Sequence, residues 1–325
     1  MTSSAVLRSA AQATLACLLL AVAPAAADPP AAGHDVRLMF TGDILLSRQV
    51  EIEMARRHGS PWMHLQKLLQ SADWAGGNLE GALGSASDCV PSRSPCFAVS
   101  DTRVAFLKSA GFRGVTIENN HAGDLGTAGR RQTRESLQRA GLMAIDFENS
   151  PQFVRVNNVE LAFLALTTIP AADGRVQELP SPEVSEKLRA ARQRADFVIV
   201  SIHWGNELIP WPGEDQRKGA AWLVEHGADL VLGHHPHVIQ PPECVEGRPV
   251  FFSLGNHVFD QANPTTKEGL IADCRADSKR LRCQSIRTHT RPGSSFPSVA
   301  DPDRAANAAL AQCVDVRGIA SSTAH

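Results

Sequence analysis

The alternation of two kinds of segment constrains this chain most. From residue 35 onward, short apolar runs alternate with stretches whose apolar residues recur at helical spacing. The run "FVIVSI" at 197–202 is typical of a strand buried on both faces, whereas "PEVSEKLRAARQRA" at 182–195 has a helical repeat. Strands that alternate with helices predict an α/β fold with helices on both faces of a sheet.

The expected elements are short and closely spaced. Strands are expected at 36–40, 114–117, 197–202, 229–233 and 250–255, and helices at 61–70, 101–111, 182–195 and 214–226, with a charged helix that ends near Ala140. Hairpins are expected at 153–166, turning at Asn157-Asn158, and at 269–287. Residues 288–325 are polar, with proline and serine at 292–302, and we expect a partly disordered tail.

The N-terminal segment predicts export. "MTSSAVLRSAAQATLACLLLAVAPAAADPP" has Arg8, an apolar stretch at 13–23 and small residues up to Ala27, which is the layout of a signal peptide at 1–27. The apolar stretch is shorter than the roughly 18–20 residues of a membrane span. We therefore favour cleavage near Ala27 over a retained anchor, and expect a periplasmic, cell-surface or secreted protein without a transmembrane segment.

Six cysteines remain after residue 27, and an even number in an exported chain suggests disulfide bonds. Six cysteines allow 15 pairings. Short loops favour Cys89–Cys96 and Cys274–Cys283, which leaves Cys244 with Cys313. A zinc ribbon is the alternative, but no C-x-x-C spacing occurs.

Charge argues against a nucleic-acid partner. The formal net charge is −2, no basic stripe is present, and the chain has no tyrosine to stack on bases.

Polar residues follow the predicted strands where each strand ends. Because the carboxyl ends of strands line the ligand crevice of an open α/β sheet, we expect these side chains to converge. Their types suit manganese, iron or zinc, so the sequence predicts a site for one or two divalent ions. The residues are Asp43, Asn78, Glu80, Asn119, Asn120, His121, Asp124, His203, Glu207, His234, His235, His237, Asn256 and His257.

Each segment alone has a plainer interpretation. "GD" after a strand is more often a turn than a ligand, asparagines can support a left-handed backbone, and His203 could be a histidine satisfied at a strand end. "GHHPH" at 233–237 is the strongest single signal, since three crowded imidazoles are costly to bury without partners. The segments are persuasive together, because they recur at successive strand ends.

Six segments together resemble the CapA family, which is associated with poly-γ-glutamate capsule synthesis and export. They are "TGDILLSR", "GNLEG", "NNHAGDLG", "HWGNE", "GADLVLGHHPHVIQPPE" and "FFSLGNHVFD", in this order. The resemblance implies a layered α/β calcineurin-like metallophosphoesterase fold, with a central β-sandwich flanked by helices, over residues 35–287.

The resemblance also implies a role for individual residues. His121 would act as an acid or stabilise the transition state, and Asp124 would orient it. The implied metal ligands are Asp43, Glu80, Asn120, His203, His235 and His237. The residues implied to orient these ligands are Asn78, Asn119, Glu207, His234, Asn256 and His257.

Three positions depart from the family pattern. The usual Asp-x-His motif reads Asp43-Ile44-Leu45, so one metal position lacks an imidazole. Glu80 stands where the bridging residue is usually aspartate. His257 stands where phenylalanine is more common, and it could supply the missing nitrogen or, more plainly, be a histidine at the rim.

Two classes of function follow, and a third is weaker. The first is a metal-dependent hydrolase, in which activated water attacks a phosphoester or an amide of poly-γ-glutamate. The second is a non-catalytic component that binds anionic polymer or organises capsule-export proteins. The third is a metal-free structural domain that retains inherited histidines.

Overall fold

The computed structural model describes residue 1, residues 35–91 and residues 94–313. Apart from Met1, the predicted signal peptide lies outside the described residues, as do residues 314–325 of the expected tail. The described residues from 35 onward belong to one unit.

The first sheet is built around β1 (Val36–Ile44), which is expected from its apolar sequence and is nearly all buried. On one side, parallel strands follow β1: β2 (Trp74–Leu79), β5 (Gly114–Thr116) and β6 (Met143–Ile145). On the other side, antiparallel strands follow: β16 (Glu268–Ala276), β17 (Leu281–Thr290) and β18 (Pro297–Val299). β15 (Asn256–Val258) pairs in parallel with the carboxyl end of β1.

The second sheet has six strands. The predicted hairpin forms β7 (Gln152–Val156) and β8 (Val159–Thr167), and Asn157 at its turn has the left-handed φ of 52° that asparagine tolerates. The sheet continues with β9 (Phe197–His203), β10 (Leu230–His234), β13 (Arg248–Phe251) and β12 (Glu243–Val245). Because β8, β9, β10 and β13 are parallel, their carboxyl ends lie at one edge.

The two sheets enclose a core of side chains from their facing surfaces. Phe163 of β8 meets Phe40 of β1 edge-on at 6.2 Å between ring centroids, and it stacks on Trp74 of β2 at 5.2 Å. These contacts join the sheets as a β-sandwich.

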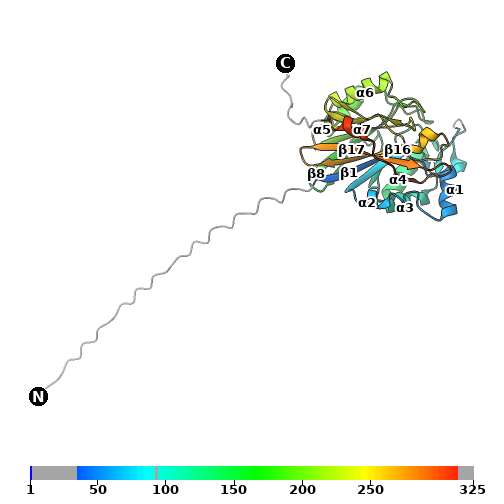
Figure 1. The fold of residues 1–325 in the computed structure, drawn as a ribbon, viewed down its shortest axis with the longest axis horizontal. Coiled ribbons are helices and arrows are strands. Elements are labelled where there is room, and N and C mark those ends of the chain that lie inside the picture. The colour runs from blue at the N-terminus through cyan, green and yellow to red at the C-terminus, as the bar shows by residue number, and fades with distance from the viewer. Residues whose placement is uncertain (2–34, 92–93, 314–325) are drawn as a thin grey trace. The chain divides into compact units, whose positions relative to one another are not determined.

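Helices cover both outer faces (Figure 1). Apolar side chains of α1 (Arg48–Arg57), α2 (Gln66–Gln70), α3 (Val104–Ala110) and α4 (Gly126–Arg139) pack in the core on the first sheet. Those of α5 (Pro182–Arg192) and α6 (Glu214–Glu225) pack on the second. The expected layered α/β fold with a central β-sandwich flanked by helices is therefore confirmed.

Local boundaries differ from the sequence expectations at three places. The helix expected from residue 61 begins at Gln66, because residues 60–65 form hydrogen-bonded turns that bury Trp62. The helix expected from residue 101 opens with a 3-10 turn, Asp101–Arg103. The strand expected at 250–255 breaks after Phe251, and β14 (Ser253–Leu254) instead pairs with β11 (Ile239–Gln240).

The folded region extends beyond residue 287, where the sequence analysis placed the start of a tail. β17 continues to Thr290, β18 follows, and α7 (Arg304–Leu310) begins at Asp303, whose side chain accepts a hydrogen bond from the backbone N–H of Ala306. Leu310 is buried in the sandwich core. The disulfide Cys244–Cys313 ties the end of this segment to β12.

All three expected disulfides are confirmed: Cys89–Cys96, Cys244–Cys313 and Cys274–Cys283. The third joins paired positions on β16 and β17.

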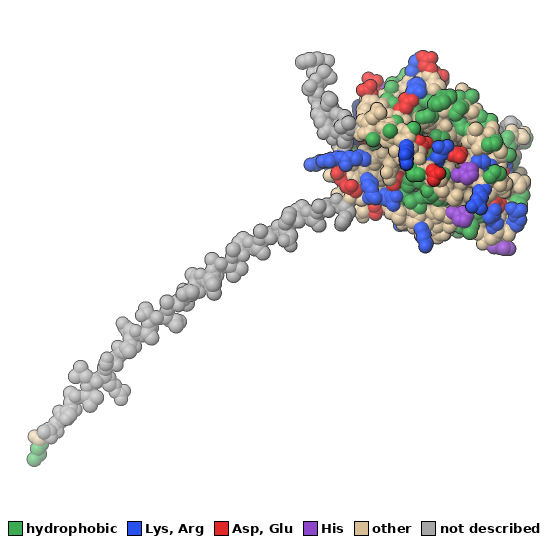
Figure 2. All heavy atoms as spheres, viewed as in Figure 1, with side chains coloured by type: hydrophobic (Ala, Val, Ile, Leu, Met, Phe, Trp, Pro, Cys, Tyr) green, Lys and Arg blue, Asp and Glu red, His purple; other side chains and the backbone are tan. Residues whose placement is uncertain are grey.

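Charges of both signs are interspersed on the face shown in Figure 2, so this face does not form an extended basic surface. Within the described part of the chain, every helix is too short or too polar to cross a membrane.

Candidate metal centre

The carboxyl ends of strands from both sheets bring the expected residues together. Asp43 is the next-to-last residue of β1, and Glu80 follows β2. His203 ends β9 beside His234, the last residue of β10. Of the expected site residues, Glu207 alone is exposed; all the others are buried, at 6% exposure or less. Buried polar groups at this density need one another, or a ligand, as partners.

Backbone geometry aims the histidines. His235 and His237 have positive φ values of 96° and 58° on either side of Pro236. Non-glycine residues rarely adopt this region, and such strain persists where the surroundings fix it, often at functional sites. The segment "GHHPH" therefore holds an unfavourable backbone that directs its imidazoles inward.

Close backbone contact also places Asp43. A Cβ atom on Gly42 would lie 1.9 Å from the carbonyl oxygen of Gly255, so only glycine fits there. The Asp43 backbone N–H donates to the same carbonyl at 3.0 Å. The glycine in "TGD" thus lets the chain before Asn256 lie directly against Asp43.

The Asp43 carboxylate is fully engaged by other residues. Its Oδ1 accepts hydrogen bonds from Asn78 Nδ2 at 2.9 Å and His234 Nδ1 at 3.1 Å, and Oδ2 accepts the backbone N–H of His235 at 3.2 Å. Burial alone would raise the pKa of Asp43, but His234 and His237 lower it well below its usual range. Asp43 is therefore a fixed anion, and Asn78 and His234 orient it.

The Glu80 carboxylate is in the opposite condition. It is fully buried, and neither oxygen has a hydrogen-bond partner among the described residues. Two imidazole nitrogens lie beyond hydrogen-bond distance of Oε1, His237 Nε2 at 3.8 Å and His121 Nε2 at 4.0 Å. Burial raises the pKa of Glu80 to about 8, with Asp43, Glu207 and Asp124 adding to the rise and His237 opposing it.

These unpartnered oxygens fit a divalent cation. Ligand atoms of Asp43, Glu80 and His203 lie within 4.8 Å of one another, and so do those of Glu207, His235 and His237. Carboxylate oxygens and imidazole nitrogens are ligands for manganese, iron and zinc. A bound cation would supply the positive charge that compensates the Glu80 carboxylate. The donors present therefore fit the divalent ion that the sequence predicts.

Asn256 fixes the orientation of His237. The Nδ2 of Asn256 donates to Gln261 Oε1 at 2.9 Å and to the carbonyl of Thr266 at 3.2 Å, so its Oδ1 faces His237 Nδ1 at 3.0 Å. His237 therefore carries its hydrogen on Nδ1 and directs Nε2 towards Glu80. Burial lowers the pKa of His237, but Glu80 and Asp43 raise it to about 9. Orientation of a ligand histidine by an oxygen acceptor is typical of metal sites.

His203 belongs to the same group of donors. Its Nε2 lies 2.9 Å from Asn120 Oδ1, and its ring centroid lies 4.7 Å from that of His235. Burial and the neighbouring His235 lower the pKa of His203 well below its usual value, which keeps the imidazole neutral. Neutral imidazole is the form that binds metal.

Asn119 shapes the loop that carries Asn120 and His121. Its Nδ2 donates to Asn78 Oδ1 at 3.0 Å and to the carbonyl of Leu79 at 2.9 Å, while its Oδ1 accepts the His121 backbone N–H at 3.1 Å. This one side chain therefore ties the loop after β5 to the end of β2.

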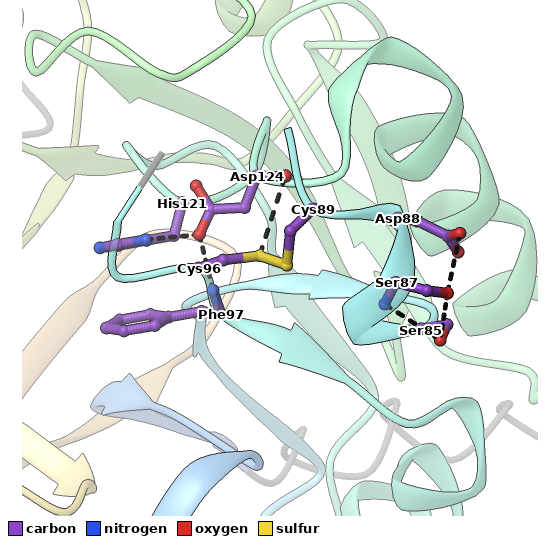
Figure 3. The surroundings of a disulfide bond; sticks show 8 residues. All are labelled: Ser85, Ser87, Asp88, Cys89, Cys96, Phe97, His121 and Asp124. Carbon is purple, nitrogen blue, oxygen red and sulfur yellow. Dashed lines mark hydrogen bonds and ion pairs between the residues drawn. A yellow bond between two sulfur atoms is a disulfide. The ribbon is translucent and has the colours of Figure 1, made fainter. Parts of the chain in front are cut away.

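His121 and Asp124 form a hydrogen-bonded pair (Figure 3), next to Phe97 and the disulfide Cys89–Cys96. His121 Nδ1 lies 2.7 Å from Asp124 Oδ2, which also accepts the backbone N–H of Phe97 at 2.7 Å. The ring of Phe97 stacks on His121 with 3.7 Å between centroids. Cys96, the residue before Phe97, is fixed by its disulfide bond with Cys89. Its Sγ lies 3.9 Å from the Asp124 carbonyl.

Leu45 occupies the position where the related motif has histidine. It is fully buried in a small apolar cluster with Phe97 and Phe259. The Phe259 ring packs 4.8 Å from His237, so this cluster forms an apolar wall beside the donors.

His257 does not lie at the rim, as the plainer interpretation had it. It is 1% exposed, and both ring nitrogens lack hydrogen-bond partners among the described residues. Because side chains alternate along β15, His257 points away from the side on which Asn256 meets His237, and its ring lies 6.5 Å from that of Trp62. It also lies outside the two groups of donors found in the described part of the chain.

Sequence reasoning missed Phe97 and underrated Glu207. The sequence signal for Phe97 was its position directly after Cys96, a cysteine of a predicted disulfide. Glu207 was expected to orient histidines, but its carboxylate lies among the donor atoms with His235 and His237.

Known proteins resemble this chain over most of its folded part. The family described as bacterial capsule synthesis protein PGA_cap matches residues 37–261. The PGA biosynthesis protein CapA of Bacillus subtilis (strain 168) is 29% identical over 248 residues, 71% of this chain and 65% of its own length. The capsule biosynthesis protein CapA of Bacillus anthracis is 28% identical over 256 residues, 72% and 62% of the two lengths. The chain thus spans slightly less than two thirds of these relatives.

A solved structure supports the fold. A crystal structure described as a novel phosphatase from Mycoplasma pneumoniae aligns with a TM-score of 0.52 and 13% identity, covering 80% of this chain and 95% of that one. At this identity the alignment concerns the fold alone. The family match covers well over half of the sequence, and the chain therefore belongs to the bacterial capsule synthesis family PGA_cap.

Proposed function

We propose that this protein is an exported, metal-dependent hydrolase that acts on poly-γ-glutamate or a related envelope polymer carrying amide or phosphoester bonds. The observation that carries the proposal is Glu80, a buried carboxylate without hydrogen-bond partners among oriented oxygen and nitrogen donors. Membership of a capsule synthesis family supports the polymer, and three disulfides support an oxidising compartment.

The ligands would be Asp43, Glu80, Asn120, His203, His235 and His237, with Glu207 within reach of the two last. A divalent cation held there supplies Lewis acidity and lowers the pKa of water, which hydrolysis of an amide or phosphoester needs.

His121 provides the acid. Asp124 accepts the hydrogen of His121 Nδ1 at 2.7 Å, which turns Nε2 towards Glu80 at 4.0 Å. A proton on Nε2 can then pass to a leaving group at the donors. Phe97 packs on the imidazole and limits its contact with water.

The test measures metal binding and turnover separately. The wild-type protein with manganese should cleave either a generic phosphodiester or poly-γ-glutamate, followed by chromophore release or by loss of polymer length. His121→Asn should lower kcat by about 10²–10⁴-fold with metal affinity unchanged, because it removes proton transfer. His58→Asn, at an exposed left-handed helix end that asparagine tolerates, is the matched control.

Failure of the wild type on both substrates, or full activity in His121→Asn, would reject catalysis. Leu45, which stands where the family pattern has an imidazole ligand, favours a second function, a non-catalytic component that binds polymer. That function predicts polymer binding that is the same in wild type and His121→Asn, without turnover in either.

A further inference from the structure

A pocket of about 420 Å³ is lined by none of the candidate metal ligands and lies next along the chain from the segment that supports them. It lies between α1, the segment at 260–267 and the turn at 292–295. Asn256 links this segment to the centre, because it contacts His237 through Oδ1 and donates from Nδ2 to the carbonyl of Thr266. Lys267, the next residue, lines the pocket.

Lys267 is an unusual residue for such a wall. Its side chain is buried at 8% exposure, and Nζ makes one hydrogen bond, to the carbonyl of Ser294 at 3.1 Å. No carboxylate of the described residues pairs with it within 4.0 Å, although an ammonium group has three hydrogens to donate. Burial lowers the pKa of Lys267, and the more distant Asp260 and Glu53 offset only part of this effect.

Glu53 does not neutralise the pocket, because its carboxylate is already engaged. Its Oε1 accepts from Ser294 Oγ at 2.7 Å and from Arg57 Nε at 2.8 Å, and its Oε2 accepts the Ser295 backbone N–H at 2.6 Å.

Asp260 is engaged through one oxygen, while its Oδ1 faces Arg48 as an ion pair without a hydrogen bond. It accepts the backbone N–H of Gln49 at 3.2 Å and pairs with Arg48 at 3.1 Å. Lys267 and Arg56 therefore line the pocket as cationic side chains that form no ion pair with a carboxylate of the described residues.

We propose that this pocket is a subsite for one carboxylate of an anionic polymer, held by Lys267 while a neighbouring bond of the polymer lies at the metal centre. The proposal rests on the proposed function and adds recognition of the repeating unit. A γ-linked glutamyl chain carries one carboxylate per residue beside each amide bond. A cation beside the cleavage site therefore matches that chain, and an uncharged chain lacks the group it binds.

The test is equilibrium binding of a γ-linked glutamate pentamer, measured by calorimetry on the metal-free protein in chelator. Lys267→Met should weaken binding at least tenfold, whereas Lys279→Met, at an exposed loop lysine, should not change it. The same pentamer with its carboxylates converted to amides should bind the wild type at least tenfold more weakly. Lys267→Arg should retain binding, and Arg56→Met should weaken it, which provides a second measurement if Lys267→Met folds poorly.

Three results would overturn the subsite: unchanged affinity in both Lys267→Met and Arg56→Met, equal binding of the amide pentamer, or displacement of the pentamer by equimolar inorganic phosphate. The measurement is independent of turnover. A protein that binds the pentamer through Lys267 but never cleaves it would therefore contradict the proposed hydrolase and leave the subsite standing.

Discussion

Two fully buried polar groups, Glu80 and His257, lack hydrogen-bond partners among the described residues, yet their surroundings differ. Burial raises the pKa of Glu80 to about 8 and lowers the pKa of His257 to about 3, so both are driven towards the neutral form. Glu80 lies among oriented oxygen and nitrogen donors, whereas His257 lies beside Trp62 in the core.

The difference teaches how an unpartnered group should be interpreted. An unsatisfied buried group costs free energy wherever it occurs, about 1–3 kcal/mol. It indicates a ligand only where other donors converge on it, because a cation can then offset the cost for several groups together. By this criterion Glu80 indicates a binding site, whereas His257 is a buried group that destabilises the core without binding a ligand.

The largest expected effect comes from Glu80→Gln. The amide matches the carboxylate in size but cannot supply a charge, so manganese affinity should fall at least about 100-fold. The metal-free protein should unfold at an unchanged or higher temperature, because a buried ionisable group is removed. Calorimetric titration with manganese measures the first effect. His257→Phe is the control, and its metal affinity should be unchanged. If Glu80→Gln binds manganese as tightly as the wild type, Glu80 is not a metal ligand.

Leu45→His tests whether the apolar wall can be converted into donors. An imidazole among Phe97 and Phe259 should lower the free energy of unfolding of the metal-free protein by about 2 kcal/mol. Excess manganese should restore the loss and add one bound ion per chain, measured by urea unfolding and elemental analysis. Leu45→Ala leaves a cavity, costs about 2–5 kcal/mol and offers no ligand. Equal recovery of both variants with metal would contradict the prediction.

Sequence patterns predicted what depends on local spacing. The hairpin turn at Asn157-Asn158 and the short disulfide loops need only neighbouring residues, and both are confirmed. The donors at strand ends were predictable because parallel strands share an edge, whatever their order.

Tertiary contacts decided the rest. The direction of His257 depends on how β15 pairs with β1, and the register of that pairing shifts between Asp43 and Ile44. Residues 304–310 were placed in a polar tail, but they form a helix whose Leu310 packs in the sandwich core. A single sequence does not contain those distances.

The pH dependence of metal binding gives a smaller effect. A cation held by Glu80 and His237 must displace the protons that their raised pKa values of about 8 and about 9 favour, so affinity should fall as pH decreases below about 9. Each displaced proton contributes about tenfold per pH unit. Titration with manganese between pH 6 and 8 measures the slope, and Glu80→Gln should reduce it by one proton. A slope that is identical in the variant would place the displaced proton elsewhere.

His257→Phe should give the smallest effect, a gain of about 1 kcal/mol in the free energy of unfolding at neutral pH, since an apolar ring removes the unsatisfied nitrogens. The gain should grow as pH falls below 6.5, because the unfolded chain then protonates His257 while the folded protein does not until about pH 3. Urea unfolding at several pH values measures it. His226→Phe is the matched control: His226 bonds the carbonyl of Trp222 at 2.8 Å, so its loss should give no gain. If His257→Phe instead destabilised the protein and weakened manganese binding, His257 would be part of the metal site together with Glu80. The distinction drawn between these two unpartnered residues would then be wrong.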